Sequence, residues 1–259
     1  MINIITELYA RFCSTGIFLK INNILLTACL RARGYNNSRN NKVSGESFFI
    51  SKILAPTNPK ICFDIGANVG NYSKELLKKT NAKIYSFEPI PTSYELLKTA
   101  LSSYGDRVVT ENKGISSMNK TLTIHYNPNA LSHASFSEDI KKVSYVTNEK
   151  KMDVEVVTLD SYCEKKLITN IDFIKIDTEG FELEVFQGAL ETFRKIQPKF
   201  IQIEFNLHQL FRNTSLNFFA EYLNNYDVYQ LIYDGWIKRD PRDPLTNIFQ
   251  FSNFVFVRH

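Results

Sequence analysis

Cysteine is scarce in this chain of 259 residues, which has only four. They lie far apart, and no two of them form a C-x-x-C pair: Cys13, Cys29, Cys62 and Cys163. This spacing excludes the usual patterns of a zinc site and of a disulfide framework. Scattered single thiols are typical of a reducing compartment, so we expect the protein to be cytoplasmic.

Long apolar runs are also absent. Residues 2–30 are largely apolar, but Arg11 and Lys20 interrupt them and leave stretches shorter than the ~20 residues that a membrane span needs. No cleavage site of the Ala-x-Ala type follows, which argues against a signal peptide. We favour a helical arm that packs on the core or on a second subunit of a homo-oligomer.

A second interpretation of this segment stays open, in which the arm rests on a membrane surface as a peripheral anchor. Its basic residues would then lie near lipid headgroups: Arg11, Lys20, Arg31 and Arg33. The stretch 34–45, rich in Asn and Ser, is typical of a linker. We therefore divide the chain into an arm with its linker, residues 1–45, and one catalytic domain, residues 46–259.

The positive charge is not concentrated in one place. The net charge of +4 comes from lysines scattered along the chain, for example in the stretches 74–79 and 141–151. A surface that binds nucleic acid would need clustered Lys and Arg residues together with aromatic residues that stack on bases, and the sequence does not show them. We expect no nucleic-acid partner. The remaining composition, 44% hydrophobic and 22% charged, is that of a globular protein.

From residue 60 onward, short apolar runs alternate with longer amphipathic ones, the pattern of strand-helix units in a parallel sheet. The expected strands are 61–65, 83–87, 107–110, 171–176 and 200–205. The first expected helix begins near Gly70, and three further helices are expected over 92–104, 181–194 and 216–225. The pattern predicts an α/β fold with a doubly wound, mostly parallel sheet and an N-terminal helical arm.

Two parts of the chain break this rhythm. Between residues 114 and 159 apolar and polar residues alternate, which predicts an inserted hairpin-like element around a polar loop, 128–151. Near the C-terminus the expected strands 228–233 and 253–257 have no helix between them. They must pair antiparallel, because a parallel return needs a crossover of a dozen or more residues.

A glycine-rich turn follows the first expected strand, in the sequence Asp64-Ile-Gly-Ala-Asn-Val-Gly70. Ligands of open sheets bind beyond the carboxyl ends of the strands, close to this first turn. Gly66 and Gly70 would let the backbone approach a ligand, and amides at the helix start could hold an anion. Glu88 ends the next strand, where a carboxylate can accept hydrogen bonds from both ribose hydroxyls. Turn and acid together predict a nucleoside ligand.

Several ordered motifs resemble the FkbM family of methyltransferases. They are the glycine turn, Phe87-Glu88-Pro89, Thr158-Leu-Asp-Ser-Tyr162 and Ile171-Asp-Phe-Ile-Lys-Ile-Asp-Thr-Glu-Gly-Phe-Glu182. The similarity runs from about Glu46 to Arg194 and is weaker beyond. It implies a class I, Rossmann-like methyltransferase that uses S-adenosylmethionine. Members of the family are similar to O-methyltransferases that act on sugars, glycans or polyketide-type metabolites, so it also implies such an acceptor.

The resemblance implies that the cofactor lies over the first turn, with its ribose on Glu88 and its adenine near the turn 112–114. The cofactor-binding residues that we expect are Asp64, Gly66, Ala67, Asn68, Gly70, Asn71, Glu88, Pro89 and Gly114.

An acidic cluster is expected at the carboxyl ends of the fourth and fifth strands. It contains the predicted catalytic residues Asp177, Glu179 and Glu204, because strand order would place Asp177 beside Glu204. An alcohol acceptor needs a base for its proton, and these carboxylates could act as that base, bind the cofactor's amino group or share a magnesium ion. We assign no metal ligand. Glu182 is expected only to stabilise its helix start, and His208 is a secondary candidate.

Two alternatives compete with a methyltransferase. An NAD-dependent oxidoreductase also uses a glycine turn and a distal acid, but Asn68 stands where its G-x-G-x-x-G pattern has the middle glycine. A non-catalytic scaffold that binds a nucleoside would retain the same turn. Calorimetric binding of S-adenosylmethionine or NAD(H) discriminates between them.

Overall fold

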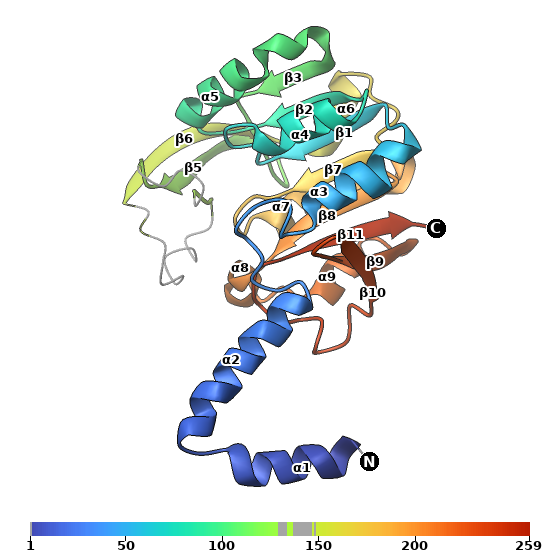
Figure 1. The fold of residues 1–259 in the computed structure, drawn as a ribbon. Helices are drawn as coiled ribbons and strands as arrows, with labels where there is room; N and C mark the ends of the chain where they lie inside the picture. The colour runs from blue at the N-terminus through green and yellow to red at the C-terminus, as the bar shows by residue number, and fades with distance from the viewer. Residues whose placement is uncertain (1, 129–133, 137–146, 148) are drawn as a thin grey trace.

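The computed structural model describes residues 2–128, 134–136, 147 and 149–259, and its centre is an eight-stranded sheet (Figure 1). The strand order is β10-β9-β11-β8-β7-β1-β2-β3. The bounds are β1 (Ile61–Ile65), β2 (Lys83–Phe87), β3 (Val108–Glu111), β7 (Phe173–Ile176), β8 (Phe200–Phe205), β9 (Tyr226–Ile232), β10 (Gly235–Arg239) and β11 (Ser252–Arg258).

Five neighbouring strands of this sheet run parallel, namely β8, β7, β1, β2 and β3. β11 lies antiparallel between β8 and β9, and β10 pairs antiparallel with β9. The expected doubly wound sheet with an antiparallel C-terminal pair is therefore confirmed. The sequence pattern did not predict β10, whose exposed Ile237 and Lys238 give it no apolar run.

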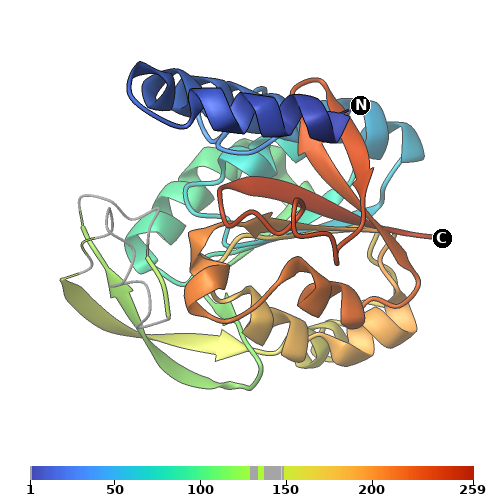
Figure 2. The same cartoon turned by 90° about the horizontal axis from the view of Figure 1, so that it is seen from below.

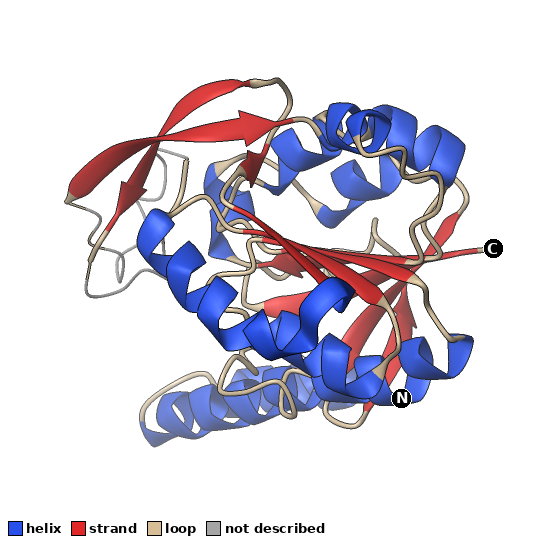
Figure 3. Cartoon of the chain, turned by 90° about the horizontal axis from the view of Figure 1, so that it is seen from above, coloured by secondary structure: helices blue, strands red, loops and turns tan. Residues whose placement is uncertain are grey.

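Helices cover both faces of the sheet (Figure 3). On one face, α3 (Glu46–Phe48), the π-helix Phe49–Leu54, α4 (Asn71–Lys79) and α5 (Pro91–Leu101) enclose an apolar cluster with Cys62 and Ile84. On the other face, α6 (Leu159–Lys165), α7 (Glu182–Gln187) and α9 (Leu216–Glu221) enclose a larger cluster with Phe63 and Phe87. Successive strand residues point to opposite faces, so each strand contributes to both cores.

Three helices are shorter than expected, and one of them, α9, ends at Glu221 instead of residue 225. α5 ends at Leu101 and continues as the 3-10 helix Ser102–Arg107. The helix predicted over 181–194 is interrupted at Gly188, where an added Cβ would lie 1.9 Å from the carbonyl oxygen of Ser116. A new turn begins beyond it, because the carboxylate of Asp160 accepts the backbone N–H groups of residues 191 and 192.

The insertion forms a separate three-stranded sheet in the order β4-β6-β5. Its strands are β4 (Gly114–Ile115), β5 (Lys120–Tyr126) and β6 (Lys150–Val157). The expected hairpin-like pairing of β5 with β6 is confirmed, while the parallel pairing of β4 with β6 was not predicted. Most of the predicted polar loop 128–151 lies outside the described residues.

The N-terminal arm consists of α1 (Ile2–Cys13) and α2 (Ile17–Ala32), which project from the body of the protein (Figures 1 and 2). No residue of α2 is buried, and Leu30 near its C-terminal end packs against the core as a partly buried side chain. Most of the arm therefore does not pack on the core of its own chain, and packing on a second subunit stays a prediction. The chain meets the body at Tyr35, which is fully buried and donates to the carbonyls of Leu245 and Thr246. In the part of the chain that the structure describes, no helix is long and apolar enough to cross a membrane.

Candidate functional site

Four parallel strands end at one edge of the sheet, and the acidic residues predicted from the sequence meet there. Because β1 pairs with β2 and β7, the turn after β1 lies between Glu88 and Asp177. The register of β7 with β8 pairs Ile176 with Ile203, which places Asp177 next to Glu204. The expected neighbourhood of these two carboxylates is confirmed.

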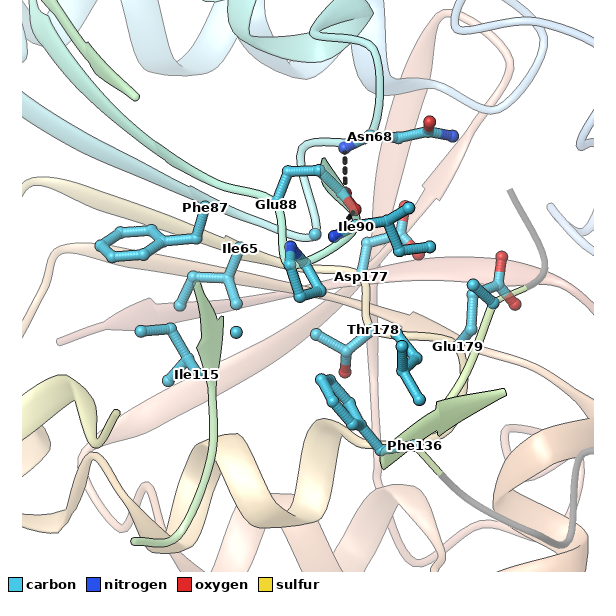
Figure 4. Close-up of a pocket in the computed structure, with 15 residues that line it drawn as sticks. Ile65, Asn68, Phe87, Glu88, Ile90, Ile115, Phe136, Asp177, Thr178 and Glu179 are labelled. Carbon is cyan, nitrogen blue, oxygen red and sulfur yellow. Dashed lines mark hydrogen bonds between the residues drawn. The ribbon is translucent and has the colours of Figure 1, made fainter. Parts of the chain in front are cut away.

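A first cavity of about 720 Å³ opens beside this edge (Figure 4). Apolar side chains make up about half of its wall, and the polar groups come from Asn68, Glu88, Asp177, Thr178 and Glu179. The insertion closes one side through Ile115, Ile124 and Phe136. Of the expected cofactor residues, Gly66, Asn68, Glu88, Pro89 and Gly114 line this cavity.

Glu88 holds the turn after β1 with both of its carboxylate oxygens. Oε2 accepts the backbone N–H of Asn68, and Oε1 accepts the N–H of Ile90, both at 2.9 Å (Figure 4). Burial raises the pKa of Glu88 to about 7, although the two amide bonds oppose the rise. Each oxygen keeps a second lone pair that can accept a ligand hydroxyl.

A second, more polar cavity lies on the other side of the turn and shares Gly66, Asn68 and Asp177 with the first. Asp64 lines it and is fully buried. Its Oδ2 accepts the hydroxyl of Ser73 at 2.6 Å, whereas its Oδ1 has no hydrogen-bond partner among the residues described. Burial raises the pKa of Asp64. The expected residues Ala67 and Asn71 also line this cavity.

Lys175 is a buried cation in the wall of the second cavity, in the middle of the apolar strand β7. Its Nζ lies 2.6 Å from Asp177 Oδ2 and 4.8 Å from the ring centroid of Tyr72. Burial acts to lower the pKa of Lys175, but the carboxylates of Asp177, Asp64 and Glu46 outweigh it, so the pKa is raised. The lysine thus compensates the negative charge of the site.

The predicted catalytic residues form one cluster. Carboxylate oxygens of Asp177, Glu179 and Glu204 lie within 4.8 Å of one another, and all three side chains are partly buried. The pKa of Glu179 is raised well above its ordinary value, first by burial and then by the charges of Glu204 and Asp177. Burial and the charge of Asp177 likewise raise the pKa of Glu204. Carboxylates so close can hold a proton near neutral pH.

A third cavity begins where this cluster ends. It is lined by Glu179 and Glu204 and by residues from the stretches 36–38, 206–207 and 249–251. Its volume is about 970 Å³, and its wall combines amide and carboxylate groups with the apolar side chains of Leu207, Phe249 and Phe251. The carboxylate cluster therefore stands between the second cavity and the third.

Two residues near the cluster have structural roles. Glu182 Oε1 accepts the backbone N–H groups of Thr178 and Gly180, which fixes the turn that carries Glu179. This agrees with the structural role expected for Glu182. His208 is 4% exposed, and its Nδ1 lies 3.4 Å from Glu179 Oε2. We therefore assign it to the positioning of that carboxylate.

The glycines of the turn are needed for packing. An added Cβ at Gly66 would lie 1.8 Å from the carbonyl oxygen of Asp177, and one at Gly70 would lie 2.7 Å from Leu97. Gly70 is not among the residues that line either cavity. The amides of Gly66 and Ala67 donate to the carbonyl of Phe87. Since Asn68 donates to Glu88, an anion could meet only the amides beyond Asn68.

Sequence reasoning missed several residues of the site. Lys175 carried a signal, a single lysine inside the apolar strand Phe173–Ile176, and such a residue is rarely buried without a charged partner. Glu46 and Ser38 line the second cavity although they come from the arm's linker and its border. No local sequence pattern predicts this, because Glu46 and Ser38 reach the cavity only through the packing of residues 34–45 along β9.

Comparisons with known proteins give consistent matches. A family model described as the methyltransferase FkbM domain matches residues 64–228. Methyltransferase sdnD of Sordaria araneosa is 32% identical in an alignment of 162 positions that covers 52% of this chain and 62% of that protein. Hexuronic acid methyltransferase AglP of Haloferax volcanii is 24% identical, over 55% of each chain.

A further relative is 2-O-methyltransferase NoeI of Sinorhizobium fredii, which is 25% identical over 62% of this chain and 69% of that protein. The chain thus spans less than two thirds of the length of sdnD and AglP. The family model begins at Asp64 and covers the turn, Glu88 and all three carboxylates of the cluster.

Proposed function

The chain belongs to the FkbM methyltransferase family, and on that premise we propose that it is an S-adenosylmethionine-dependent O-methyltransferase. Its acceptor is a hydroxyl group of a sugar, a glycan or a related small metabolite. The sheet, with β11 inserted antiparallel, is the class I methyltransferase fold that the sequence motifs implied. The relatives named for hexuronic acid and 2-O-methylation support the choice of acceptor.

The observation that carries the proposal is the pair of cavities that meet at Gly66, Asn68 and Asp177. S-adenosylmethionine has an apolar adenine, a ribose with two hydroxyls and a charged amino-acid end. The first cavity matches the nucleoside half, with apolar walls at Phe87 and Ile115 and an acceptor at Glu88. The second cavity matches the amino-acid half, because buried carboxylates surround it.

Asp64 supplies a specific test of this fit. Its Oδ1 is buried and has no hydrogen-bond partner in the described residues, a costly state for a carboxylate oxygen. The amino group of the cofactor would give that oxygen a charged donor. Asp64 would therefore hold the amino-acid end together with Ala67 and Asn71, and Glu88 would hold the ribose.

The bound cofactor supplies an electrophilic methyl group, and the residues of this chain must align the acceptor and take its proton. An acceptor bound in the third cavity would lie against Glu179 and Glu204. Burial and neighbouring negative charges raise the pKa values of both carboxylates, so each holds a proton more readily than an ordinary carboxylate does. We assign Glu204 as the base, because Glu179 already faces His208. Asp177 forms an ion pair with Lys175, so we assign it to charge compensation and not to proton transfer.

A methyl-transfer assay tests the proposal. The purified chain is incubated with methyl-labelled S-adenosylmethionine and a panel of uronic acids, neutral sugars and oligosaccharides, and products are located by mass spectrometry. Parallel reactions contain magnesium or a chelator, because the three carboxylates have oxygens that a cation could share. Label on a sugar oxygen supports the proposal. Transfer only to nitrogen or carbon acceptors would refute the O-methyltransferase assignment.

A further inference from the structure

The arm exposes an unusual amount of apolar surface. Of the 20 large apolar side chains exposed in the described residues, 12 belong to α1 and α2. They are Ile4, Ile5, Leu8, Tyr9, Phe12, Ile17, Phe18, Leu19, Ile21, Ile24, Leu25 and Leu26. Soluble proteins rarely expose a contiguous apolar patch of more than a few hundred Å² without a partner. Some surface must therefore cover these helices.

The two helices of the arm have a defined arrangement. The hydroxyl of Tyr9 donates to Asn22 Oδ1 at 2.5 Å, and Asn22 Nδ2 donates to the carbonyl of Cys13 at 2.8 Å. These polar contacts connect α1 to α2 across Gly16, which has a φ of 62°. The inner corner between the helices is thus polar, while their apolar side chains point outward.

The charge of the arm identifies what covers it. Residues 2–33 contain one acidic residue, Glu7, and four basic residues, Arg11, Lys20, Arg31 and Arg33. Arg239 of β10 adds a fifth base at the foot of the arm, where it donates to the carbonyl of Arg33 at 3.5 Å. No ion pair of Arg33 or Arg239 with a carboxylate is found among the described residues. Apolar helices flanked by unpaired bases match the chemistry of an anionic lipid surface.

A second copy of the chain is a poorer match. Two arms packed together would bring like charges of both copies into one interface, whose core usually excludes charged residues. In addition, exposed apolar residues follow one another along α2 from Ile17 to Leu19 and from Ile24 to Leu26. One partner helix covers only a single stripe of α2, whereas the boundary between headgroups and acyl chains can receive apolar side chains of both α1 and α2.

We propose that residues 2–33 anchor the protein to the surface of an anionic bilayer. The apolar side chains of α1 and α2 enter the boundary between headgroups and acyl chains, and the basic residues meet the lipid phosphates. The arm leads directly into Asn36 and Ser38, which line the third cavity, so the anchored protein holds this cavity close to the membrane. The inference is independent of the reaction that the site performs.

Vesicle cosedimentation of the full chain tests the proposal. Vesicles of phosphatidylcholine alone are compared with vesicles that also contain phosphatidylglycerol, at low and high salt. The variant Phe12→Ser/Ile24→Ser removes exposed apolar side chains, and Leu96→Ser on α5 is the matched control. Lys20→Gln/Arg31→Gln removes two charges, with Lys98→Gln as its control. Thermal unfolding of each variant confirms that the fold is retained.

The chain should bind the anionic vesicles and lose affinity at high salt. Each charge removed from the arm should weaken binding about five-fold, since one base contributes about 1 kcal/mol at an anionic surface. The apolar double variant should lose binding, and both controls should retain it. Sedimentation velocity without lipid measures the oligomeric state and so tests whether a second copy covers the arm instead. A dimer that Phe12→Ser/Ile24→Ser dissociates, or a monomer that binds neither vesicle, would overturn the proposal.

Discussion

Oε2 of Glu88 lies 2.9 Å from the backbone nitrogen of Asn68, so the end of β2 is fastened to the turn after β1. The same carboxylate accepts the N–H of Ile90, which lies in the wall of the first cavity. One side chain thus shapes the nucleoside cavity and presents its charge to it. The assignment of the cofactor depends on this residue more than on any other.

Replacing Glu88 by Gln should weaken the binding of S-adenosylmethionine. The amide cannot accept two backbone N–H groups and two ribose hydroxyls as a carboxylate does. Loss of charge-assisted hydrogen bonds worth about 1.5–3 kcal/mol predicts a loss of affinity of about 10- to 100-fold. Calorimetric titration measures it, with the exposed Glu95→Gln on α5 as control. An unchanged affinity in Glu88→Gln would remove the ribose assignment.

The pKa of Glu88 predicts two pH dependences of opposite sign. Because burial raises this pKa to about 7, Glu88 favours folding when protonated. That contribution is complete below the ordinary carboxyl pKa and is lost as pH rises through about 7. Cofactor affinity should instead rise through the same range, since the ionised carboxylate accepts both hydroxyls. Urea unfolding and titrations at several pH values measure the two, and Glu88→Gln should flatten both curves.

Glu204→Gln should separate stability from turnover. Burial and Asp177 raise the pKa of Glu204, so its negative charge is disfavoured in the folded protein. A neutral Gln should leave the melting temperature unchanged or raise it by about 2–4 °C. Turnover should fall by about 10²–10⁴-fold because the general base is lost. Full activity in this variant would show that Glu204 does not take the proton.

Lys175→Met should destabilise the protein strongly. The substitution leaves Asp177, Asp64 and Glu46 without their shared cation, and removing one partner of a buried pair costs about 3–5 kcal/mol. Urea unfolding measures the change, and the exposed Lys79→Met should be nearly neutral. Lys175→Met/Asp177→Asn should recover part of the loss. A double variant as unstable as Lys175→Met would argue against charge compensation as the role of the lysine.

Two glycine substitutions test the packing of the turn. Gly66→Ala should cost more than about 4 kcal/mol or prevent soluble expression, because its Cβ would lie 1.8 Å from the carbonyl oxygen of Asp177. Gly105→Ala is the matched control, since Gly105 also has a positive φ but has no atom within 4 Å of an added Cβ. Its cost should be about 1–3 kcal/mol from backbone strain alone, since φ 54° with ψ −131° is a sparsely populated combination for a residue with a Cβ. Equal costs, measured by thermal unfolding, would contradict this account of Gly66.

Strand periodicity predicted the parts of the fold that position the site. The bounds of β1, β2 and β8 agree with the expected ranges because each is a short apolar run that ends at a polar residue or turn. Since parallel strands share one carboxyl edge, the neighbourhood of Asp177 and Glu204 followed from the same pattern. The acidic cluster could therefore be located from the sequence, whereas the distances and pKa values within it could not.

What the sequence did not reveal depends on tertiary contacts. The break of the predicted helix at Gly188 results from a close approach to Ser116, a residue some 70 positions away in the chain, which no local pattern encodes. Tyr35 stands in a polar stretch typical of a linker, yet it is fully buried because the stretch crosses the C-terminal strands. Composition alone does not indicate whether such a connection is packed.

Calorimetric titration of the full chain with S-adenosylmethionine and, separately, with NAD(H) tests the central claim most directly. The cavities on either side of Gly66, the ribose acceptor at Glu88 and the partnerless oxygen of Asp64 predict binding of S-adenosylmethionine and no binding of NAD(H). Binding of NAD(H) alone, or of neither compound, would contradict the assignment of a methyltransferase site.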